Sequence, residues 1–305
     1  MTGIARIGPA VRSMLQVAGL DPVLVEPLID LAIAEDLDGG VDVTTVATVP
    51  FEQRATLDLV ARRAGVVAGI PVAAAVFDVV SGEEDIDLAF CVTDGAFVQP
   101  GEVILSATGR THDLLQAERP ALNLLSHLSG IATLTRTWVD EVASTKAAIR
   151  DTRKTTPGMR ALEKYAVRCG GGVNHRMSLA DAALVKDNHV EAAGGVAQAF
   201  RLVRERFPGV PVEVEVDSLE QLEEVLDAGA DLILLDNFTV DQMREAVMRT
   251  DGRARLEASG GLSLEAARAV AETGVDYLAV GALTHSAPVL DIGADLRQVS
   301  DAPDH

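Results

Sequence analysis

The sequence predicts an α/β fold, and three observations support that prediction. Beyond residue 146, short β-rich runs alternate with segments of helical pattern, as in proteins built on a parallel sheet or barrel. Residues 55–109 instead hold short strand-like runs separated by turn dipeptides, which indicates a smaller α+β unit. The chain has 305 residues, of which 48% are hydrophobic and only 3% aromatic. Such a chain can form about two domains, and we expect their cores to be mainly aliphatic.

The elements are expected in a simple order along the chain. Asp21 and Pro22 are typical of the start of a helix, which the glycine pair at residues 39–40 ends. The next expected elements are two strands and a long helix that links the domains, at residues 56–61, 103–107 and 113–144. Six β-rich runs follow, at residues 148–149, 183–185, 212–216, 232–235, 256–258 and 277–280. A complete (β/α) barrel has eight strands, so the pattern alone does not establish a closed barrel.

Charge and composition exclude several classes of protein. With 26 Lys and Arg against 46 Asp and Glu, the formal net charge is −20, which argues against nucleic-acid binding. The longest uncharged apolar stretch, residues 64–77, is interrupted by Gly and Pro and is too short to span a bilayer. The first twenty residues lack the continuous apolar core of a secretory signal. We therefore expect a cytoplasmic protein without a membrane partner, in which Cys91 and Cys169 are reduced thiols.

One segment reverses the acidic charge of the chain. Residues 146–189 hold nine Lys or Arg and four Asp or Glu, a net charge of +5 that leaves −25 for the rest. Basic residues that fit helix surfaces or element ends are expected on solvated faces, namely Arg150, Arg160, Lys164 and Arg168. Four others are not expected on a solvated face, namely Arg153, Lys154, Arg176 and Lys186. Three of them, Arg153, Lys154 and Lys186, follow strands and are expected to converge on the mouth of the barrel. Desolvated cations need anionic partners, so this group predicts a ligand with several negative charges.

His175 belongs to the same candidate site. It precedes Arg176 and follows three consecutive glycines at residues 170–172, which suggests a backbone that must approach something closely. Three other histidines lack metal-like spacing and are expected to be structural, namely His112, His127 and His285. Cys169 has no evident partnered base, which favours an unreactive thiol over a nucleophile.

Two carboxylates at neighbouring strand ends predict a metal site. In residues 212–217, Glu213, Glu215 and Asp217 alternate with valines, so their side chains share one face of the strand. Glu215, with a valine on each side, is the better functional candidate, whereas Glu213 or Asp217 can equally lie at a strand end in water. Asp236 ends the next apolar run. Two hard oxygen ligands near phosphate groups suit Mg²⁺, so Glu215 and Asp236 are candidate ligands.

Two glycine-containing segments predict a phosphate site. They follow the last two expected strands, where barrels bind phosphate through backbone N–H groups. Their residues are Ser259, Gly260 and Gly261 in the first segment and Gly281, Ala282 and Leu283 in the second. The sequence contains no Walker A motif, no Rossmann G-x-G-x-x-G and no H-E-x-x-H, which argues against NTPase, dinucleotide-binding and zincin functions.

Three motifs taken together resemble those of a known family. Residues 151–158 read DTRKTTPG, residues 170–176 read GGGVNHR, and residues 184–189 read LVKDNH. Shorter matches occur at residues 118–125, 129–133, 213–216, 235–237, 259–261 and 281–286. With these strings, in this order, the chain resembles the quinolinate phosphoribosyltransferases over roughly residues 20–296.

The resemblance implies a fold and an activity. The fold would be an N-terminal α/β sandwich domain over residues 1–128 and an open, incomplete (β/α) barrel of the type II phosphoribosyltransferase kind over residues 129–287. The C-terminal segment, residues 288–305, would pack back on the first domain. The activity would be transfer of the 5-phosphoribosyl group from phosphoribosyl pyrophosphate to quinolinate, with loss of pyrophosphate and CO₂. The product would be nicotinate mononucleotide for NAD synthesis, and Mg²⁺ would accompany the pyrophosphate.

The resemblance also implies roles for individual residues. Those that hold the pyridine dicarboxylate would be Arg153, His175, Arg176 and Lys186. The catalytic set would be Lys154, which meets phosphate or pyrophosphate, and two acids near the ribose hydroxyls and the metal, Glu215 and Asp236. The loops around the 5′-phosphate would be residues 259–261 and 281–283. Arg119 matches an arginine that the family donates across a dimer interface, so we expect a homodimer or a larger assembly.

Two other functions stay open on the sequence. A Schiff-base aldolase on the same barrel would use Lys186 as its nucleophile. A non-catalytic paralogue would lose part of the dicarboxylate-binding set, which this chain keeps. Both alternatives retain the fold, so the chemistry of the cavity has to distinguish them.

Overall fold

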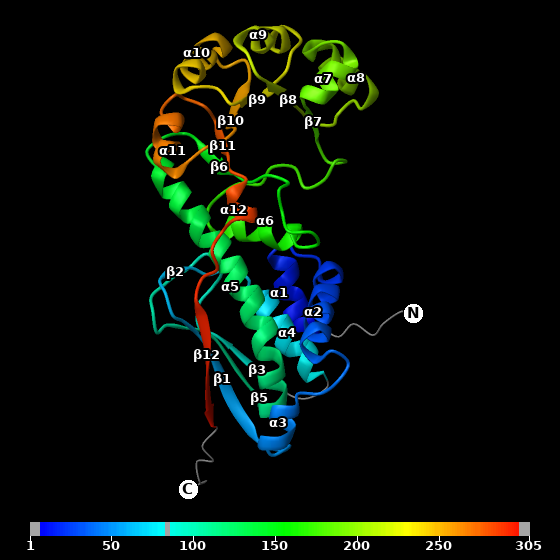
Figure 1. The fold of residues 1–305 in the computed structure, drawn as a ribbon, viewed down its shortest axis with the longest axis vertical. Helices are drawn as coiled ribbons and strands as arrows, with labels where there is room; N and C mark the ends of the chain where they lie inside the picture. The colour runs from blue at the N-terminus through cyan, green and yellow to red at the C-terminus, as the bar shows by residue number, and fades with distance from the viewer. Residues whose placement is uncertain (1–6, 83–85, 299–305) are drawn as a thin grey trace. The chain divides into compact units, whose positions relative to one another are not determined.

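The computed structural model describes residues 7–82 and 86–298, and the chain forms two compact units (Figure 1). Unit 1 comprises Met1–Leu134, Ala161–Gly170 and Ala287–His305, and unit 2 comprises Thr135–Arg160 and Gly171–Ser286. The C-terminal residues 299–305 of the expected returning segment lie outside the described residues. Among the described residues, none of the helices is both long and apolar enough to cross a membrane.

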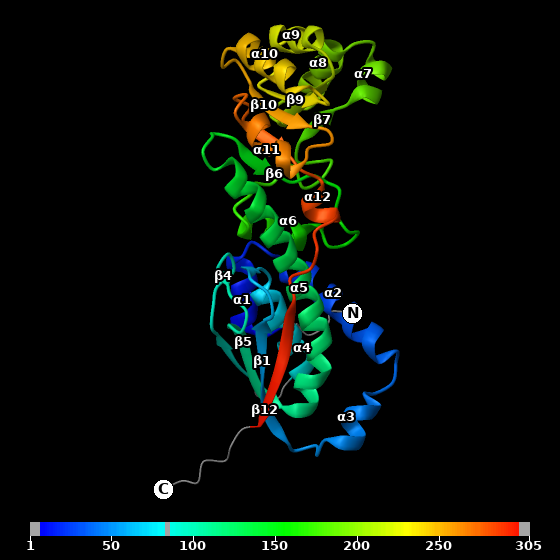
Figure 2. The same ribbon diagram turned by 60° about the vertical axis from the view of Figure 1, so that its left-hand side comes forward.

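Unit 1 is built on an antiparallel sheet with the strand order β12-β1-β5-β3. Its strands are β1 (Arg54–Ala61), β3 (Asp87–Phe90), β5 (Val103–Arg110) and β12 (Ile292–Gln298), and a separate antiparallel pair is formed by β2 (Gly65–Val66) and β4 (Phe97–Val98). Its helices are α1 (Pro9–Val17), α2 (Pro22–Leu37), α3 (Val43–Thr48), α4 (Ile70–Ser81), most of α6 (Arg160–Cys169) and the first part of α5 (Thr111–Val142). Strand β12 extends the sheet by pairing with β1 along its length (Figure 2).

Local sequence explains the helices of this unit. The side chain of Asp21 accepts a hydrogen bond from the Val23 N–H at 3.0 Å and caps α2, as expected from the Asp-Pro pair. Helix α4 packs against β5, and α1 and α2 pack outside it (Figure 1). Ten of the twelve residues of α4 are buried, so it carries apolar side chains around its whole circumference. Such a helix has no polar face, which is why no helical period marks it in the sequence.

Helix α6 contradicts one expectation about its charges. Lys164 is completely buried rather than on a solvated face. The reason is that α6 buries six consecutive residues, 162–167, and so is packed on most of its sides. Arg168, at the end of the helix, remains near the surface and donates to the Ala18 carbonyl at 3.1 Å.

Unit 2 is built on a parallel sheet of six strands within the described residues, in the order β6-β11-β10-β9-β8-β7. Its strands are β6 (Ala148–Arg150), β7 (Ala183–Val185), β8 (Val212–Val216), β9 (Leu232–Asp236), β10 (Arg255–Ser259) and β11 (Tyr277–Ala279). Its helices are α7 (Asp187–Ala193), α8 (Val196–Arg206), α9 (Leu219–Asp227), α10 (Val240–Thr250), α11 (Leu264–Ala271) and α12 (Ala282–His285). Strands β6 and β7 form the two edges, so this sheet is open, and the predicted α/β fold with an incomplete barrel is confirmed.

The register of this sheet explains how the site is assembled. Neighbouring parallel strands pair Val216 with Leu235 and Ser259 with Asp236, so their carboxyl ends lie at one edge. Buried aliphatic side chains such as Val214, Ile233 and Leu256 alternate along the strands with Glu215, Leu234 and Glu257, so the two sets lie on opposite faces of the sheet. The polar residues that follow each strand are therefore brought together by the backbone, as in other proteins with parallel α/β sheets.

Candidate active site

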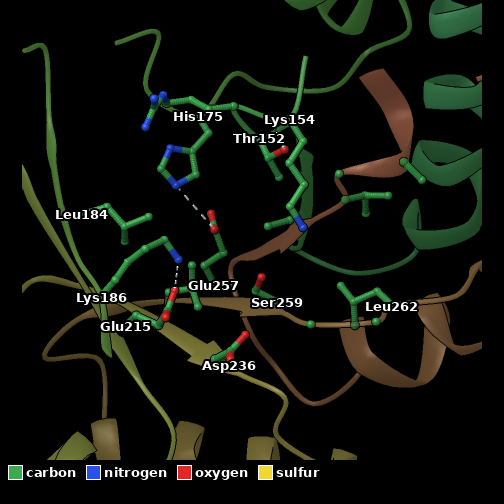
Figure 3. A pocket seen from close by; sticks show the side chains of 18 of the residues that line it. Thr152, Lys154, His175, Leu184, Lys186, Glu215, Asp236, Glu257, Ser259 and Leu262 are labelled. Atoms are coloured by element: carbon green, nitrogen blue, oxygen red, sulfur yellow. Dashed lines mark hydrogen bonds and ion pairs between the residues drawn. The ribbon is translucent and has the colours of Figure 1, made fainter. Parts of the chain in front are cut away.

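A cavity of about 640 Å³ lies at the carboxyl ends of the unit 2 strands (Figure 3). Its volume falls within the range of small-molecule sites. Twelve of the residues predicted from the sequence line it, namely Arg153, Lys154, His175, Arg176, Lys186, Glu215, Asp236, Ser259, Gly260, Gly261, Gly281 and Ala282. Leu184, Leu234, Ala279 and Val280 add an apolar wall against which a flat ring can pack.

Two predicted residues do not line this cavity. Leu283 is completely buried, because it faces the core at the start of the short helix α12. The sequence-based prediction concerns the backbone N–H groups of residues 281–283, so the burial of this side chain does not test it. Arg119 belongs to unit 1, where its side chain is 60% exposed and lies 3.7 Å from the Glu118 carboxylate.

Two arginines of the cavity have buried nitrogens that lack partners. The Nε atoms of Arg153 and Arg176 are buried, and neither has a hydrogen-bond partner among the described residues. Arg176 is fixed at its other end, where a terminal nitrogen donates to the Ala182 carbonyl at 2.9 Å. Burial and the neighbouring Arg153 both lower the pKa of Arg176 below its ordinary value. Two cations that are desolvated side by side indicate a place for an anion, because an anion would supply the missing acceptors.

Two lysines approach the cavity from different strand ends (Figure 3). Lys186 follows β7, and its ammonium group forms an ion pair with Glu215 of the neighbouring strand β8. Lys154 lies in the loop after β6. Its backbone carbonyl accepts a hydrogen bond from the Thr284 hydroxyl at 2.7 Å. That bond joins the Lys154 loop to helix α12, which follows β11. In the sheet, β6 and the strands that carry the two acids lie on opposite sides of β11.

The two predicted metal ligands, Glu215 and Asp236, both line the cavity. They end or nearly end the adjacent strands β8 and β9. One oxygen of Asp236 accepts from the Asn237 side-chain amide at 2.8 Å, which leaves its other oxygen available. Both groups offer hard oxygen ligands, so the donor set fits Mg²⁺, with Lys186 competing for Glu215.

The glycine at position 260 brings two backbone segments into close approach. Gly260 has a φ of +95°, and a Cβ atom there would lie 2.3 Å from Oδ1 of Asn237. Asn237 itself has a φ of +57° and donates its backbone N–H to the Ser259 carbonyl at 3.0 Å. The loop after β10 is therefore packed tightly against the loop after β9, and only glycine fits at residue 260.

A buried charged cluster that the sequence did not predict lies at the wall of the cavity, which two of its members, His175 and Glu257, line. Glu213 and Glu257 are at most 3% exposed, and the guanidinium of Arg150 lies 3.5 Å from the first carboxylate and 2.7 Å from the second. His175 Nε2 lies 2.8 Å from Glu213 and 3.7 Å from Glu257. Arg150 is thus not on a solvated face as predicted, because both carboxylates and the Tyr277 ring, 4.9 Å away, enclose it.

This cluster has a distinctive electrostatic state. Burial, and then the nearby Glu213, raise the pKa of Glu257 well above its ordinary value. His175, Glu213 and Glu257 offer ligand atoms within 4.8 Å of one another, a separation at which a metal ion can bind. The Arg150 guanidinium already supplies a positive charge to both carboxylates, so an ion-pair network accounts for the arrangement.

Cys169 belongs to unit 1 and is not positioned for nucleophilic chemistry. Burial, and then the nearby Asp94, raise the pKa of its thiol to about 12. A thiol in that state is protonated at neutral pH and is a poor nucleophile. This agrees with the sequence-based expectation of an unreactive thiol.

An open parallel sheet with cations, paired acids and a tight glycine loop at its carboxyl edge defines an enzyme that acts on small, multiply charged anions. Two family models match the chain: the quinolinate phosphoribosyl transferase N-terminal domain over residues 42–129 and the C-terminal domain over residues 131–295. The chain belongs to the quinolinate phosphoribosyltransferase family.

Relatives from several bacteria support this assignment. The nicotinate-nucleotide pyrophosphorylase [carboxylating] of Mycobacterium leprae is 57% identical over 87% of this chain and 94% of its own length. A probable enzyme of the same name from Bacillus subtilis is 40% identical over 89% of this chain and 93% of its own. The crystal structure of NadC from Streptococcus pyogenes matches 92% of this chain and 99% of its own with a TM-score of 0.88 at 38% identity.

Proposed function

We propose that this protein transfers the 5-phosphoribosyl group of phosphoribosyl pyrophosphate to quinolinate, with release of pyrophosphate and CO₂ and formation of nicotinate mononucleotide for NAD synthesis. The observation that carries the proposal is that the buried Nε atoms of Arg153 and Arg176 have no hydrogen-bond partner in the part of the chain that the structure describes, in a cavity that Glu215 and Asp236 also line. A dicarboxylate supplies a separate carboxylate to each arginine, whereas a monocarboxylate has to be shared between them. The reaction is proposed to take place in the cytoplasm.

The cationic side of the cavity binds and orients quinolinate. Arg153, Arg176 and Lys186 hold its two carboxylates, and the apolar wall that includes Leu184 and Leu234 packs against the ring. Binding two carboxylates at once places the ring nitrogen in a single pose. Such fixed orientation of two reactants removes much of the entropic part of the barrier.

The acidic side of the cavity faces the ribose. Departure of pyrophosphate leaves positive charge at the anomeric carbon, and Glu215 and Asp236 stabilise that charge. Mg²⁺, held by these carboxylates together with the pyrophosphate, would neutralise the leaving group. Lys154 contributes a further positive charge for the pyrophosphate, and the N–H groups of residues 259–261 and 281–282 receive the 5′-phosphate.

Decarboxylation follows from the new bond to the ring nitrogen. Once that nitrogen carries the ribose it is cationic, so the ring accepts the electron pair of the breaking C–C bond and CO₂ leaves. A proton then replaces the lost carboxylate on the ring carbon. The protein needs no covalent nucleophile for any of these steps.

We also propose that the active unit is a homodimer or a larger assembly in which Arg119 reaches the cavity of a second copy. In support, the Arg119 side chain is 60% exposed, and Glu118, at 3.7 Å, is only a weak partner. The proposal predicts that Arg119→Ala loses activity, and that mixing it with a cavity variant such as Lys154→Ala restores part of the activity through mixed dimers. An Arg119→Ala protein with full activity contradicts it.

The aldolase alternative is disfavoured by the surroundings of Lys186. A Schiff-base lysine is usually activated in an apolar pocket or beside another cation. Here the Lys186 side chain is 45% exposed and its ion-pair partner is the Glu215 carboxylate, so it lies neither in an apolar pocket nor beside a cation that would activate it.

The test is pyrophosphate release from phosphoribosyl pyrophosphate and Mg²⁺ with quinolinate, with nicotinate as the parallel control. We expect release with quinolinate and none with nicotinate, because nicotinate has only one carboxylate for the two arginines. Release with nicotinate alone, or with neither acid, would overturn the proposed function and leave the fold assignment intact.

A further inference from the structure

His175 lines the cavity, yet both of its ring nitrogens are used by the protein. Its Nδ1 atom accepts a hydrogen bond from the backbone N–H of Arg176 at 2.7 Å. Its Nε2 atom lies 2.8 Å from Oε2 of Glu213, and a carboxylate oxygen accepts hydrogen bonds but cannot donate them. The proton of the ring is therefore on Nε2, and a ring with a bare Nδ1 is uncharged.

Glu213, the acceptor of that proton, is buried and lies near a second charged side chain. Glu213 is 3% exposed and lies on β8, with the Arg150 guanidinium 3.5 Å from its other oxygen. Arg150 is itself fixed by Glu257 at 2.7 Å and by the ring of Tyr277. Glu257 is the second carboxylate near His175, and the dashed line between them in Figure 3 marks a contact of 3.7 Å, which is longer than a hydrogen bond.

The other side of His175 leads directly to Arg176. The backbone N–H of His175 donates to Asp151 at 2.8 Å, and the Arg176 N–H donates to the imidazole. Both peptide groups of this segment are thereby anchored to side chains. Arg176 leaves the segment with one nitrogen bonded to the Ala182 carbonyl and its Nε without a partner among the described residues.

We propose that Glu213 is a positioning residue of the active site, which fixes His175 as the neutral Nε2–H tautomer and through it places Arg176 for the substrate dicarboxylate. In this arrangement His175 accepts a hydrogen bond from the backbone of Arg176, and its uncharged ring does not neutralise the substrate dicarboxylate. The inference rests on the proposed function for its substrate, and on the distances among Glu213, His175 and Arg176 for its geometry.

Two substitutions separate this role from a general role in stability. Glu213→Leu removes the acceptor and leaves Arg150 with Glu257 as a one-to-one buried ion pair, so the charge beneath the cavity stays balanced. Glu213→Gln keeps a side-chain oxygen that can accept from Nε2. Glu213→Leu should raise KM for quinolinate at least about tenfold and leave KM for phosphoribosyl pyrophosphate within about twofold. Glu213→Gln should restore KM for quinolinate to within about threefold of the original protein.

The tautomer gives a readout that does not depend on activity. In protein labelled with ¹⁵N-histidine, the His175 signals are identified by their loss in His175→Gln. The original protein and Glu213→Gln should show a protonated Nε2 and a bare Nδ1, and Glu213→Leu should lose this pattern. An unchanged tautomer in Glu213→Leu overturns the proposal, as does an equal rise in KM for both substrates.

The two proposals fail in distinguishable ways. If the original protein releases no pyrophosphate with quinolinate, the proposed function is wrong whatever the NMR spectrum shows. If it is active and Glu213→Leu has the KM of the original protein for quinolinate, only the positioning role of Glu213 is overturned.

Discussion

The two units of the chain differ in whether particular charged side chains have partners. In unit 1, charged side chains at the sheet are paired at the surface, with Arg62 bonded to Asp295 at 2.5 Å and Arg297 to Asp58 at 2.6 Å. In unit 2, two arginines of the cavity, Arg153 and Arg176, each have a buried Nε atom. Neither atom has a hydrogen-bond partner among the described residues. Solvent screens the paired surface charges, so they contribute little to stability, whereas buried guanidinium nitrogens without an acceptor are costly to folding and are explained by a ligand.

The same contrast extends to the response to pH. The Arg297 guanidinium, which donates to Asp58, holds the pKa of that carboxyl below its ordinary value. Burial instead raises the pKa of Glu257 at the wall of the cavity of unit 2. Unit 1 thus contains a carboxylate that favours the folded state when ionised, and unit 2 contains one that favours it when protonated.

The largest effect is expected where an unpaired charge meets the ligand. Arg176→Ala should raise KM for quinolinate about a hundredfold or more, because a buried charge pair contributes about 2–5 kcal/mol. KM for phosphoribosyl pyrophosphate should change much less. Steady-state kinetics with each substrate varied in turn measures both values.

Arg244→Ala is the matched control for that prediction. Arg244 lies on α10 of the same unit and pairs at the surface with Asp241 at 2.8 Å. Its removal should leave both KM values within about twofold. Equal effects of the two substitutions would contradict the view that the unpaired arginine binds the substrate.

A smaller effect is expected from the backbone of the phosphate loop. Gly260→Ala forces a Cβ atom against Asn237 and should raise KM for phosphoribosyl pyrophosphate about tenfold, since the loop has to shift. Gly252→Ala is its control, because Gly252 also has a positive φ, +73°, but its Cβ would meet no atom within 4 Å. The control should lose about 1–2 kcal/mol of stability with unchanged kinetics. If both variants have unchanged kinetics, residue 260 does not belong to the phosphate site.

The pH contrast predicts a third, more modest effect, on stability. Because the folded pKa of Glu257 is raised, its contribution is complete at pH values below the unfolded pKa and is lost as pH rises through the folded pKa. Glu257→Gln should therefore reduce the fall in melting temperature between pH 6 and pH 9, measured by circular dichroism. Asp58→Asn should instead act on the acid side, where the ionised form of Asp58 is lost as pH falls. A melting temperature that falls equally in the original protein and Glu257→Gln would contradict this account.

The sequence was sufficient for the strands of unit 2 because each one has the same local pattern. Apolar runs such as residues 232–235 end in a polar residue, here Asp236, and the observed strand β9 ends there too. Helix α4 was not predicted, because side chains buried on all sides erase the helical period. Strand β12 depends on pairing with β1, a contact between residues more than 200 positions apart that no local pattern reveals.

For the site, strand ends were predictable and the layer beneath them was not. Lys186 and Asp236 follow apolar runs and line the cavity as expected. Glu257 lies between the buried residues Leu256 and Ala258 of β10, and a charge between two apolar residues was the signal that could have identified it. Arg150 was expected on a solvated face because it comes at the end of an element. Its two carboxylate partners are distant in the sequence, so no local pattern revealed them.

The smallest effect should come from a paired surface charge of unit 1. Arg297→Ala removes an exposed guanidinium, and Asp58 keeps its hydrogen bond from the Ser106 hydroxyl at 2.5 Å. Both KM values should stay within about twofold, and the melting temperature should change little at neutral pH, because solvent screens such a pair. Steady-state kinetics and thermal unfolding at two salt concentrations measure this. A change in KM for quinolinate comparable to that of Arg176→Ala would contradict the comparison. Arg297 would then affect substrate binding although it has an ion-pair partner, so the presence of a partner would not distinguish structural from substrate-binding arginines.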